Sequence, residues 1–424
     1  MNRLLPVLLL LIVASPALAG TVVHEVPGAY ARITDALAAA TPGDTVRVAA
    51  GTYSAAANGE VFPLAILPPG VVLEGAGAGL SILDAAGAAS VVRCANTGVR
   101  VTGFTLLDGS AQKGGGVHVE SGDAQIDHNA IVGCAAIERG ASIWAAPGTT
   151  PWIHHNVMWA SRDALPASGG DPHGIQLTGA NALVEFNTIG RGDSNGLIVE
   201  QPGEPVIRNN IFFENGSATL NRGRGICALG GPGTVIRNNV FYGNHIAAIL
   251  VQVISSFQDL TAQQANDANP DDAILENLDA NPMLVDADAM DVHLTFCSPA
   301  IDAGWIGSPL DPDGTRADVG AFYFDHSVVG VGEHGSGAAP GLEAAPNPFR
   351  GRTSLSYTLA RAGRVRLSIV NARGQLVRTL VRANLPAGPH SVAWEGAAEV
   401  GAGVYFARLE ADGRVTSHAL VRLE

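Results

Sequence analysis

Apolar and polar positions follow a fixed order along the middle of this chain, apolar-x-x-Asn-x-apolar. Two copies are nearly identical, Ile-Arg-Asn-Asn-Ile-Phe at 207–212 and Ile-Arg-Asn-Asn-Val-Phe at 236–241. Successive asparagines of this pattern lie 27, 31, 23 and 29 residues apart. A motif that returns at such intervals is typical of a solenoid, in which coils of the chain stack on one another. The five asparagines are Asn129, Asn156, Asn187, Asn210 and Asn239.

The residues of each copy predict how a coil is built. Asn tolerates the left-handed backbone that a sharp bend needs. Stacked coils lie ~4.8 Å apart, so that equivalent amides can hydrogen-bond as a ladder. A glycosylation signal is the alternative for an asparagine, and Asn215-Gly216-Ser217 is such a sequon, but the fixed offset to apolar residues favours the ladder. The flanking residues are expected to form two inward columns, Ile126, Ile153, Val184, Ile207 and Ile236, and Ile131, Met158, Ile189, Phe212 and Phe241.

Other segments predict the rest of the solenoid. Residues 21–48 are expected to form a strand, a helix at 33–40 and a strand, and the helix would cover the open edge of the first coil. Residues 254–272 are expected to form a loop that lengthens one coil. A second column of strands begins with glycine, at 116–119, 174–177, 196–199 and 225–228, and 140–144 joins it after an irregular start.

The C-terminal part of the chain differs in composition. The last coils are expected to include 281–286, 298–304 and 318–322. Residues 330–341, rich in Gly, Ser and Ala, predict a flexible linker. From 342 to 424, short alternating strands are separated by turn residues, as in a small β-sandwich. The sequence therefore predicts an all-β protein with a solenoid at 20–329 and a separate C-terminal domain.

The first residues predict export. A basic start, an apolar run at 4–13 and the string Ala17-Leu18-Ala19 describe a secretory signal peptide over 1–19. That run is too short to span a membrane and no later run is long enough, so no transmembrane segment is expected in the mature chain. The four cysteines, which could pair or act as small apolar fillers, are Cys94, Cys134, Cys227 and Cys297.

The net charge of −14 is unevenly distributed. Residues 20–339 carry a net −20, whereas 340–424 hold 11 arginines and 6 acidic residues, a net of +5. An acidic body argues against nucleic acid as a partner, and it disfavours polyanionic glycans unless a cation bridges the two. Aromatic residues make up only 5% of the chain, which limits the platforms on which sugars could stack.

The helix at 33–40 is followed by Pro42-Gly43-Asp44-Thr45-Val46 and then by Gly51-Thr52-Tyr53. Together these resemble the opening of secreted pectate-lyase-like proteins, whose fold is a right-handed parallel β-helix. The next segment, 58–75, resembles an uncharacterised N-terminal β-helix family of bacterial proteins, and the segments after 281 resemble the terminal coil of bacterial surface β-helix proteins. The resemblance implies a right-handed parallel β-helix with an N-terminal capping helix, and it does not indicate an activity.

Residues 345–349, 371–374, 388–394 and 401–405 resemble C-terminal sorting domains associated with type IX secretion. An immunoglobulin-like domain of flagellar hook-capping proteins shares the pattern, but a signal peptide and a preceding ectodomain favour sorting. The resemblance implies export to the outer-membrane surface or the exterior of a bacterium. It also implies the secretion and surface-anchoring machinery as partners of this domain, which is often removed.

Two groups of residues are candidates for contact with a substrate. In sugar-active β-helices the substrate lies along the outward face of one strand column and under the adjoining loops. The outward residues expected in the glycine-led column include Ile198 and Cys227, which suit a sugar poorly, and an ordinary sheet face is the alternative. The candidates for substrate binding by stacking and hydrogen bonds are His118, Trp144, Gln176 and, on another column, Trp152.

The longest interval of the repeat, 156–187, carries the candidate catalytic residues. Lyase chemistry needs a base that removes the proton beside a carboxylate and a cation that stabilises the developing charge. The strings at 125–129 and 152–156 resemble the Trp-Ile-Asp-His of pectate lyases, each with one departure, and the repeat explains both as ladder coils. The residues of suitable type in the long interval are Arg162, Asp171 and His173.

Two further sets of polar residues have simpler explanations. The outward neighbours of the ladder are expected to form a solvated face, on which Glu185 and Arg208 would pair for up to about 1 kcal/mol. Calcium is the candidate cofactor, because clusters of acidic residues supply the oxygen ligands that it needs. The alternative is that these residues only form acidic turns. The ladder neighbours are Asp127, His154, Glu185, Arg208 and Arg237, and the candidate calcium ligands are Asp311, Asp313 and Asp318, with a second cluster at Asp286, Asp288 and Asp291.

Two functions stay open at this point. The first is an exported, surface-attached β-helix that binds polysaccharide, with cleavage by a lyase or a glycoside hydrolase reaction as an extension. The second is a non-catalytic surface or adhesion protein in which the solenoid is a rigid stalk. The two differ in whether polar and aromatic side chains converge in one groove.

Overall fold

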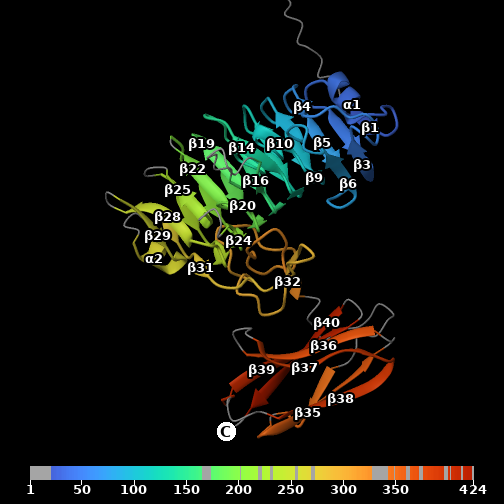
Figure 1. Cartoon of the computed structure of the whole chain (residues 1–424), viewed down its shortest axis with the longest axis vertical. Coiled ribbons are helices and arrows are strands. Elements are labelled where there is room, and N and C mark those ends of the chain that lie inside the picture. The colour runs from blue at the N-terminus through green and yellow to red at the C-terminus, as the bar shows by residue number, and fades with distance from the viewer. Residues whose placement is uncertain are drawn as a thin grey trace, which may run out of the picture. The chain divides into compact units, whose positions relative to one another are not determined.

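Three parallel sheets build the solenoid, as one computed structural model of the chain shows (Figure 1). The predictions for the signal peptide, for the linker at 330–341 and for Asp171 lie outside the described residues. Two compact units divide the chain, the first comprising residues up to Leu183 together with 200–203, and the second the remainder. The described residues are 21–164, 173–200, 202–217, 222–229, 233–253, 256–268, 273–326, 342–347, 349–359, 363–371, 376–395, 400–401, 403–411 and 414–422.

Each coil contributes strands to sheets that run in sequence order. The first sheet consists of β1 (Val23–Val26), β2 (Thr45–Val48), β5 (Val72–Gly75), β8 (Arg100–Thr102), β12 (Gln125–Asp127), β16 (Trp152–His154), β20 (Leu183–Glu185), β23 (Val206–Arg208), β26 (Val235–Arg237) and β30 (Ile274–Leu275). The second consists of β3 (Gly51–Ser54), β6 (Ser81–Asp84), β9 (Thr105–Leu107), β13 (Ala130–Val132), β17 (Val157–Trp159), β21 (Thr188–Gly190), β24 (Ile211–Phe213), β27 (Val240–Tyr242) and β31 (Leu278–Asp279).

The third sheet is the predicted glycine-led column, and all five of its predicted strands are present. It continues to a final hairpin in which the last two strands pair antiparallel. Its strands are β4 (Leu64–Ile66), β7 (Val92–Cys94), β11 (Val117–Val119), β15 (Ile143–Ala145), β19 (Ile175–Thr178), β22 (Leu197–Glu200), β25 (Arg224–Ala228), β28 (Ala247–Val253) and β29 (Ser256–Leu260). The fold class is therefore confirmed as a right-handed parallel β-helix.

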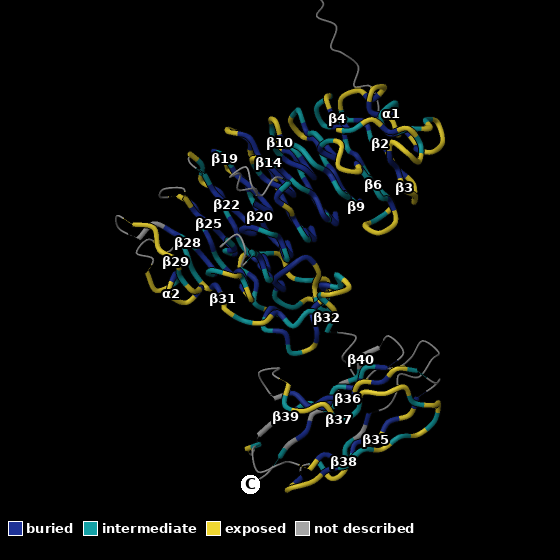
Figure 2. Tube along the Cα trace, viewed as in Figure 1, coloured by how far each residue is buried: buried dark blue, intermediate teal, exposed yellow. Residues whose placement is uncertain are grey.

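The predicted core columns are buried. All ten residues beside the ladder asparagines are 2% exposed or less, and Figure 2 shows the buried residues following the strands. Phe212 stacks on Phe241 of the next coil, with ring centroids 5.2 Å apart. Each coil thus covers the apolar residues of its neighbours, which a single coil could not do alone.

A short helix covers the start of the solenoid, as predicted. Helix α1 (Ile33–Ala39) buries Ile33, Ala36 and Leu37. Its first two backbone N–H groups donate to the buried carboxylate of Glu60, at 2.7 and 3.0 Å. Because these donors have no partner inside the helix, a carboxylate from a later coil satisfies them and fixes the cap.

The asparagine ladder is confirmed. The backbone N–H and the Nδ2 of Asn129 both donate to Oδ1 of Asn156, at 3.1 and 3.2 Å. In the second unit the same pair of bonds joins Asn187 to Asn210 and Asn210 to Asn239. The ladder continues further than predicted, through Asn277 to Asn266, whose Oδ1 accepts the last pair.

The left-handed bend lies one residue before each ladder asparagine, which corrects the prediction that the asparagine itself makes it. The ladder asparagine is selected for its amide, whereas the preceding position tolerates several residue types. The residues with positive φ are His128, His155, Phe186, Asn209 and Asn238, at 53–57°.

The C-terminal end of the solenoid differs from the predicted loop and last coils. Residues 256–267 form strand β29 and helix α2 (Ala262–Asp267) rather than a loop. Strands β32 (Leu284–Asp286) and β33 (Asp291–Leu294) pair with each other, antiparallel, and do not join the three sheets. The following segment folds back onto the ladder corner, where Trp305 N–H donates to Oδ1 of Asn209 at 2.7 Å.

A fourth small sheet was not predicted. It consists of β10 (Ser110–Lys113), β14 (Ala135–Arg139) and β18 (Arg162–Asp163), which pair in parallel. These strands lack the inward apolar pattern of the other columns, so the sequence gives little sign of them. They lie in the coils that carry the candidate substrate residues, and they lengthen those coils on one side.

The C-terminal domain contains two antiparallel sheets with a core of their own. Trp394 and Phe349 are among its most buried side chains. One sheet has the order β34 (Leu342–Ala345), β35 (Arg352–Leu359), β38 (Gly388–Glu395), and the other β37 (Leu376–Leu385), β36 (Gly363–Asn371), β39 (Gly403–Ala411), β40 (Arg414–Arg422).

Cys94, Cys134 and Cys297 are free thiols in the structure. Burial raises the pKa of Cys94 and of Cys134 to about 12, so both stay protonated. They act as small core residues. Over the part of the chain that the structure describes, none of the helices has the length and apolar character needed to cross a membrane.

Candidate functional site

The outward residues of the third sheet align as predicted, but they do not line an open groove. His118, Trp144 and Gln176 lie opposite one another on neighbouring strands. Trp144 is 8% exposed and Gln176 is 2% exposed. The side chain of His118 packs edge-on against the Trp144 ring, with centroids 4.7 Å apart.

The fourth sheet explains this burial. Lys113, from β10, places its ammonium 5.0 Å from the centre of the Trp144 ring. Gly140, which follows β14, donates its N–H to Oε1 of Gln176 at 3.0 Å. The indole N–H of Trp144 donates to Thr178 Oγ1 at 3.1 Å. The substrate role of these residues stays a prediction, and it would require this cover to open.

Two of the predicted catalytic residues, Arg162 and His173, make hydrogen bonds to other parts of the solenoid. Arg162 donates to the carbonyl oxygen of Gly133 at 3.0 Å through Nε and to Asp108 at 2.5 Å through Nη2. His173 is 2% exposed, and its carbonyl oxygen accepts from Ala141 N–H at 2.6 Å. Asp171 lies outside the described residues, so the geometry of Arg162, Asp171 and His173 as a group is not described. Their catalytic role stays a prediction.

Three of the five outward neighbours of the ladder are buried and the two arginines, Arg208 and Arg237, are half-buried, which corrects the expected solvated face. Asp127 is 0% exposed, Glu185 is 5% exposed and His154 is 6% exposed. The predicted pair of Glu185 and Arg208 is present at 2.8 Å, and the Arg208 guanidinium also lies 4.3 Å from the Trp305 ring centre. The segment that folds back supplies part of this cover, and sequence periodicity does not reveal it.

A cluster of polar residues surrounds the buried carboxylate of Asp127. Arg100, one coil earlier, donates to its two oxygens at 2.8 and 2.7 Å, and Thr102 donates to Oδ2 at 2.9 Å. Nδ1 of His128 lies 2.8 Å from the same oxygen. Burial alone would raise the pKa of Asp127, but the hydrogen bonds from Arg100, His128 and Thr102 outweigh it and hold that pKa below its usual value.

The neighbouring coil adds two neutral histidines to this cluster. The Gln125 amide nitrogen lies 3.0 Å from Nε2 of His154, and the Nδ1 atoms of His154 and His155 are 2.9 Å apart. An amide nitrogen only donates, so Nε2 of His154 accepts and its Nδ1 carries the proton toward His155. Burial is the main cause that lowers the pKa of both histidines to about 4.

One aromatic side chain of this cluster is exposed to solvent. Trp152 is 41% exposed, and its ring centroid lies 4.0 Å from that of His154. It is in register with Gln125 and Arg100 on the two preceding strands. His128, whose side chain is 60% exposed, stacks parallel to His155 at 5.1 Å. The result is an accessible indole beside an accessible imidazole.

This arrangement permits two kinds of chemistry. An exposed indole can cover the apolar face of a sugar ring, while amide and guanidinium groups bond its hydroxyls. In addition, Asp127 accepts the Nδ1 proton of His128, which leaves Nε2 as the basic atom toward solvent. Among the described residues none hydrogen-bonds to that Nε2. A histidine held in this way can act as a general base or acid.

The predicted calcium ligands are bound to the backbone of the terminal segment. Asp313 accepts from the N–H groups of Thr315 and His326, and Asp318 accepts from those of Asp302 and Phe324. Burial, followed by the nearby Asp318 carboxylate, raises the pKa of Asp311 to about 6. Across the described residues, no group of three or more His, Cys, Asp or Glu side chains is arranged to hold a metal ion. The calcium site stays a prediction.

A second asparagine ladder, which the sequence analysis did not predict, has a signal in the sequence. Asn215 and Asn244 each lie five residues after a ladder asparagine. The N–H and Nδ2 of Asn215 donate to Oδ1 of Asn244 at 3.1 and 3.0 Å. The sequon asparagine is therefore 2% exposed and structural, and aligning the two nearly identical repeats would have identified it.

Fold and comparisons together define a class of protein. By its architecture the chain is a right-handed parallel β-helix protein. Residues 89–258 match the family model described as a right-handed beta helix region, which spans strands β7 to β28 and less than half of the chain. A search of curated proteins and a search of solved structures found no match.

Proposed function

We propose that this chain is an exported protein attached to a bacterial surface, and that its solenoid binds a polysaccharide on the outward face of β12 and β16. The observation that carries this proposal is the exposed indole of Trp152, placed in register with Gln125 and Arg100. Parallel strands present successive coils at a constant spacing, which suits a ligand that is itself a repeating chain.

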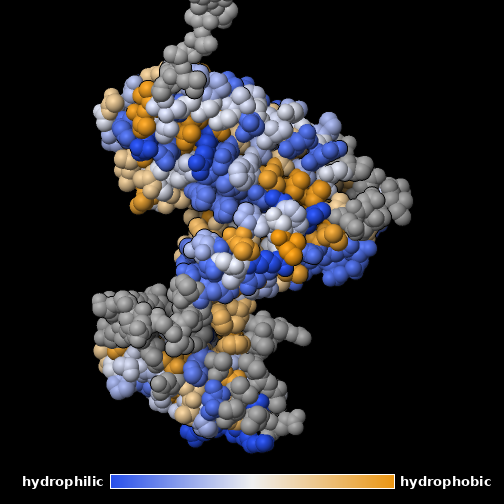
Figure 3. Space-filling view, turned by 180° about the vertical axis from the view of Figure 1, so that it is seen from behind, coloured by the Kyte–Doolittle hydropathy of each residue, from blue (hydrophilic) through white to orange (hydrophobic). Residues whose placement is uncertain are grey.

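The charge of the molecule narrows the kind of polysaccharide. The body of the chain carries an excess of acidic residues, and the guanidinium of Arg100 is already paired with Asp127. Figure 3 shows one face of the molecule as largely hydrophilic, with separate apolar patches. A neutral polysaccharide avoids the repulsion that a uronate-rich chain would meet, so a neutral chain is expected.

Binding is tested on a glycan array with plant, algal and bacterial polysaccharides, with and without calcium. Substitution of Trp152→Ala is expected to weaken binding of the bound glycan at least tenfold. The matched control is Tyr323→Ala, which removes another exposed aromatic side chain, 43% exposed, from the terminal segment. If no glycan binds, or if both variants bind as the wild type does, the protein is better described as a non-catalytic surface stalk.

A second function, cleavage of the bound chain, is favoured by the Asp127–His128 pair. General acid or base catalysis needs an accessible imidazole of fixed orientation within reach of the substrate. His128 is accessible, and Asp127 fixes its Nδ1. The expected result for His128→Gln is normal glycan binding with loss of product, measured by chromatography of released oligosaccharides. Equal product from both proteins would exclude His128 as the catalytic group.

A further inference from the structure

The second asparagine ladder is open at its end. Asn215 donates both its N–H and its Nδ2 to the amide oxygen of Asn244. Asn244 in turn donates Nδ2 to the carbonyl oxygen of Phe212 at 3.0 Å. No described residue accepts from the backbone N–H of Asn244 or from the other hydrogen of its Nδ2. Two donors at this rung therefore converge where the next amide oxygen would lie.

The first ladder shows what such an end requires. Its last rung, Asn277, donates the same pair of hydrogens to Oδ1 of Asn266, at 3.2 and 3.1 Å. Asn266 comes from helix α2 and not from a coil, so the chain provides a dedicated group to close that ladder. By the register of β27 and β31, the position of the next rung is that of Pro282, which has no side-chain amide, and its neighbour Asn281 accepts from Met283 N–H through its Oδ1.

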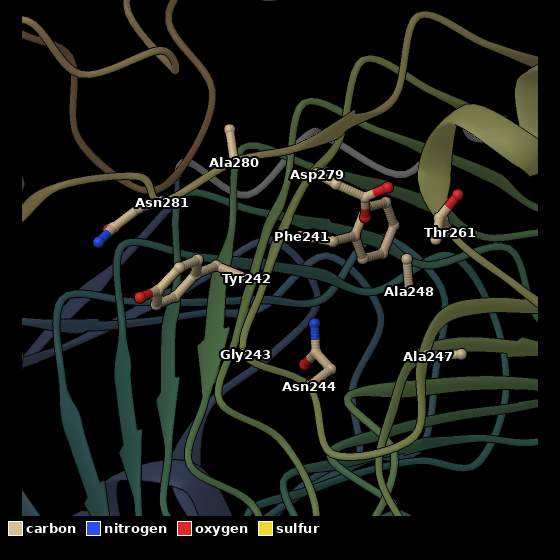
Figure 4. A pocket seen from close by; sticks show the side chains of 10 residues that line it. All are labelled: Phe241, Tyr242, Gly243, Asn244, Ala247, Ala248, Thr261, Asp279, Ala280 and Asn281. Carbon is tan, nitrogen blue, oxygen red and sulfur yellow. The ribbon is translucent and has the colours of Figure 1, made fainter. Parts of the chain in front are cut away.

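A cavity of about 280 Å³ adjoins Asn244 at this end of the ladder. Figure 4 shows the Asn244 amide nitrogen directed toward the side where Phe241 and Asp279 lie, whereas Asn281 points away. The alanines 247, 248 and 280 and the partly exposed ring of Tyr242 supply apolar surface. Since drug-sized ligands occupy roughly 300–1,000 Å³, this volume suits one small ring and its substituent.

We propose that this cavity binds the acetamido group of an N-acetylated sugar. The carbonyl oxygen of the acetamide accepts from the N–H and Nδ2 of Asn244, as Oδ1 of Asn244 itself accepts from Asn215. Its N–H donates to the carbonyl oxygen of Phe241 or to the carboxylate of Asp279. The acetamide methyl packs among the alanines, and the sugar ring lies on Tyr242.

The neighbouring groups favour a neutral amide over other oxygen ligands. The carboxylate of Asp279 lines the cavity and repels an anion, although one of its oxygens is used by the Ala262 N–H at 2.7 Å. The Phe241 carbonyl already accepts from Ala280 N–H at 3.1 Å, and a carbonyl oxygen has a second lone pair. In the preceding coil, the equivalent carbonyl oxygen, that of Phe212, accepts a hydrogen bond from Nδ2 of Asn244. A carboxylate could accept both hydrogens but has none to donate to the Phe241 carbonyl, and a hydroxyl would have to accept and donate through a single oxygen.

The residues that line the site lie at 241–248, at 261 and at 279–281, so it does not depend on the Trp152 face. The test uses the whole protein and saturation-transfer NMR with N-acetylglucosamine, glucose and acetamide as probes. The expected result is binding of N-acetylglucosamine, with the strongest signals on the acetyl methyl, and at least tenfold weaker binding of glucose. Acetamide alone is expected to compete at higher concentration. Equal binding of glucose would overturn the proposal.

Two variants locate the binding. Asn244→Asp retains the oxygen that Asn215 needs and removes the Nδ2 donors, so acetyl signals are expected to be lost. Ala247→Phe fills the cavity without a change in the ladder and should have the same effect, which separates binding from folding. Asn96→Asp, at an asparagine in a different coil, is the matched control. Retention of binding by the folded Ala247→Phe protein would refute the site, and Trp152→Ala is expected to leave it intact.

Discussion

At each ladder corner, two consecutive residues have different physical roles. The first has a positive φ, and His155 and Phe186 adopt it as well as Asn209, because the turn constrains the backbone and not the side chain. The second must be asparagine, because only a side-chain amide of this length both accepts two hydrogens and donates to carbonyl oxygens of adjacent coils. Asn239 makes all of these bonds at 0% exposure.

Replacement of one buried rung is therefore expected to be costly. Asn239→Ala leaves the N–H of Asn210 without an acceptor, removes one of the three acceptors of its Nδ2, and removes the donor to the Ile207 carbonyl oxygen. Each unsatisfied buried group costs about 1–3 kcal/mol. We expect a loss of about 3 kcal/mol or more in the free energy of unfolding, measured by urea denaturation. Asn96→Ala removes two hydrogen bonds that are both exposed to water, and it should change the free energy of unfolding by less than about 1 kcal/mol. Equal effects would contradict the ladder account.

The histidine cluster gives a prediction about pH. The pKa values of His154 and His155 are lowered to about 4, mainly by burial. The unfolded chain binds these protons near the ordinary value of 6.5, so the two histidines destabilise the fold as pH falls from about 6.5 to about 4. Asp311, whose pKa is raised to about 6, has the opposite effect over much of the same range.

Ring signals of labelled histidine in NMR spectra separate these contributions. The signals of His154 and His155 are expected to stay in the neutral form at pH 5 and to change only near pH 4. The variant Gln125→Ala, which removes the donor to Nε2 of His154, is expected to alter the signals of His154. Protonation of both rings above pH 6 would show that the cluster is open to water.

The local repeat predicts some side-chain environments of the solenoid and not others. The repeat predicted the inward columns and the ladder correctly, because both follow from a local period. The burial of Asp127 and His154 depends on residues from other coils, such as Arg100 and Gln125, and no local pattern reveals it. The same holds for Trp144, which becomes covered by Lys113.

Among the helices and strands, those at the two ends of the solenoid differ from the repeat, because each exposed end coil must be covered by a separate element. Helix α1 covers the first coil with a cap from Glu60. Helix α2 covers the last coils and supplies Asn266 to the ladder. The sequence predicted the first because an apolar, alanine-rich run stops at Pro42-Gly43. The second is short and polar, so the sequence predicts a loop there.

The cap of α2 consists of two reciprocal hydrogen bonds. Thr261 Oγ1 accepts from Gln264 N–H at 3.1 Å, and Gln264 Oε1 accepts from Thr261 N–H at 3.0 Å. Loss of such a cap costs about 1 kcal/mol, so Thr261→Ala should increase the local opening of α2 about fivefold in hydrogen exchange. Gln263→Ala, at an exposed position of the same helix, is the control. If exchange in α2 is unchanged, the cap does not limit opening.

At the scale of the whole molecule, the two domains are built by different physical means. The solenoid repeats one coil and depends on its ladders, whereas the C-terminal sandwich has a single core around Trp394 and Phe349. The sequence predicted this division from the change in pattern near 342. The sign of the charge changes at the same place, from a net −20 to a net +5, which is consistent with different partners for the two parts.

The last prediction concerns the role of the C-terminal domain in export. If it is a sorting signal, a chain that ends at residue 341 should fold its solenoid, because the sandwich core contains only residues from 342 onward, but it should not reach the cell surface. Surface labelling and protease accessibility of intact cells measure location, and circular dichroism of the purified protein measures folding.

A point variant tests whether recognition requires the folded domain. Trp394 is 1% exposed, and Trp394→Ala removes about 3–5 kcal/mol of core stability, enough to unfold many small domains. We expect this variant to be retained inside the cell, while Leu376→Ala, at a position that is 56% exposed, should be exported normally. A truncated chain that still reaches the surface would refute the sorting role, because the export signal would then lie outside the sandwich. The sandwich would in that case be better described as a binding module.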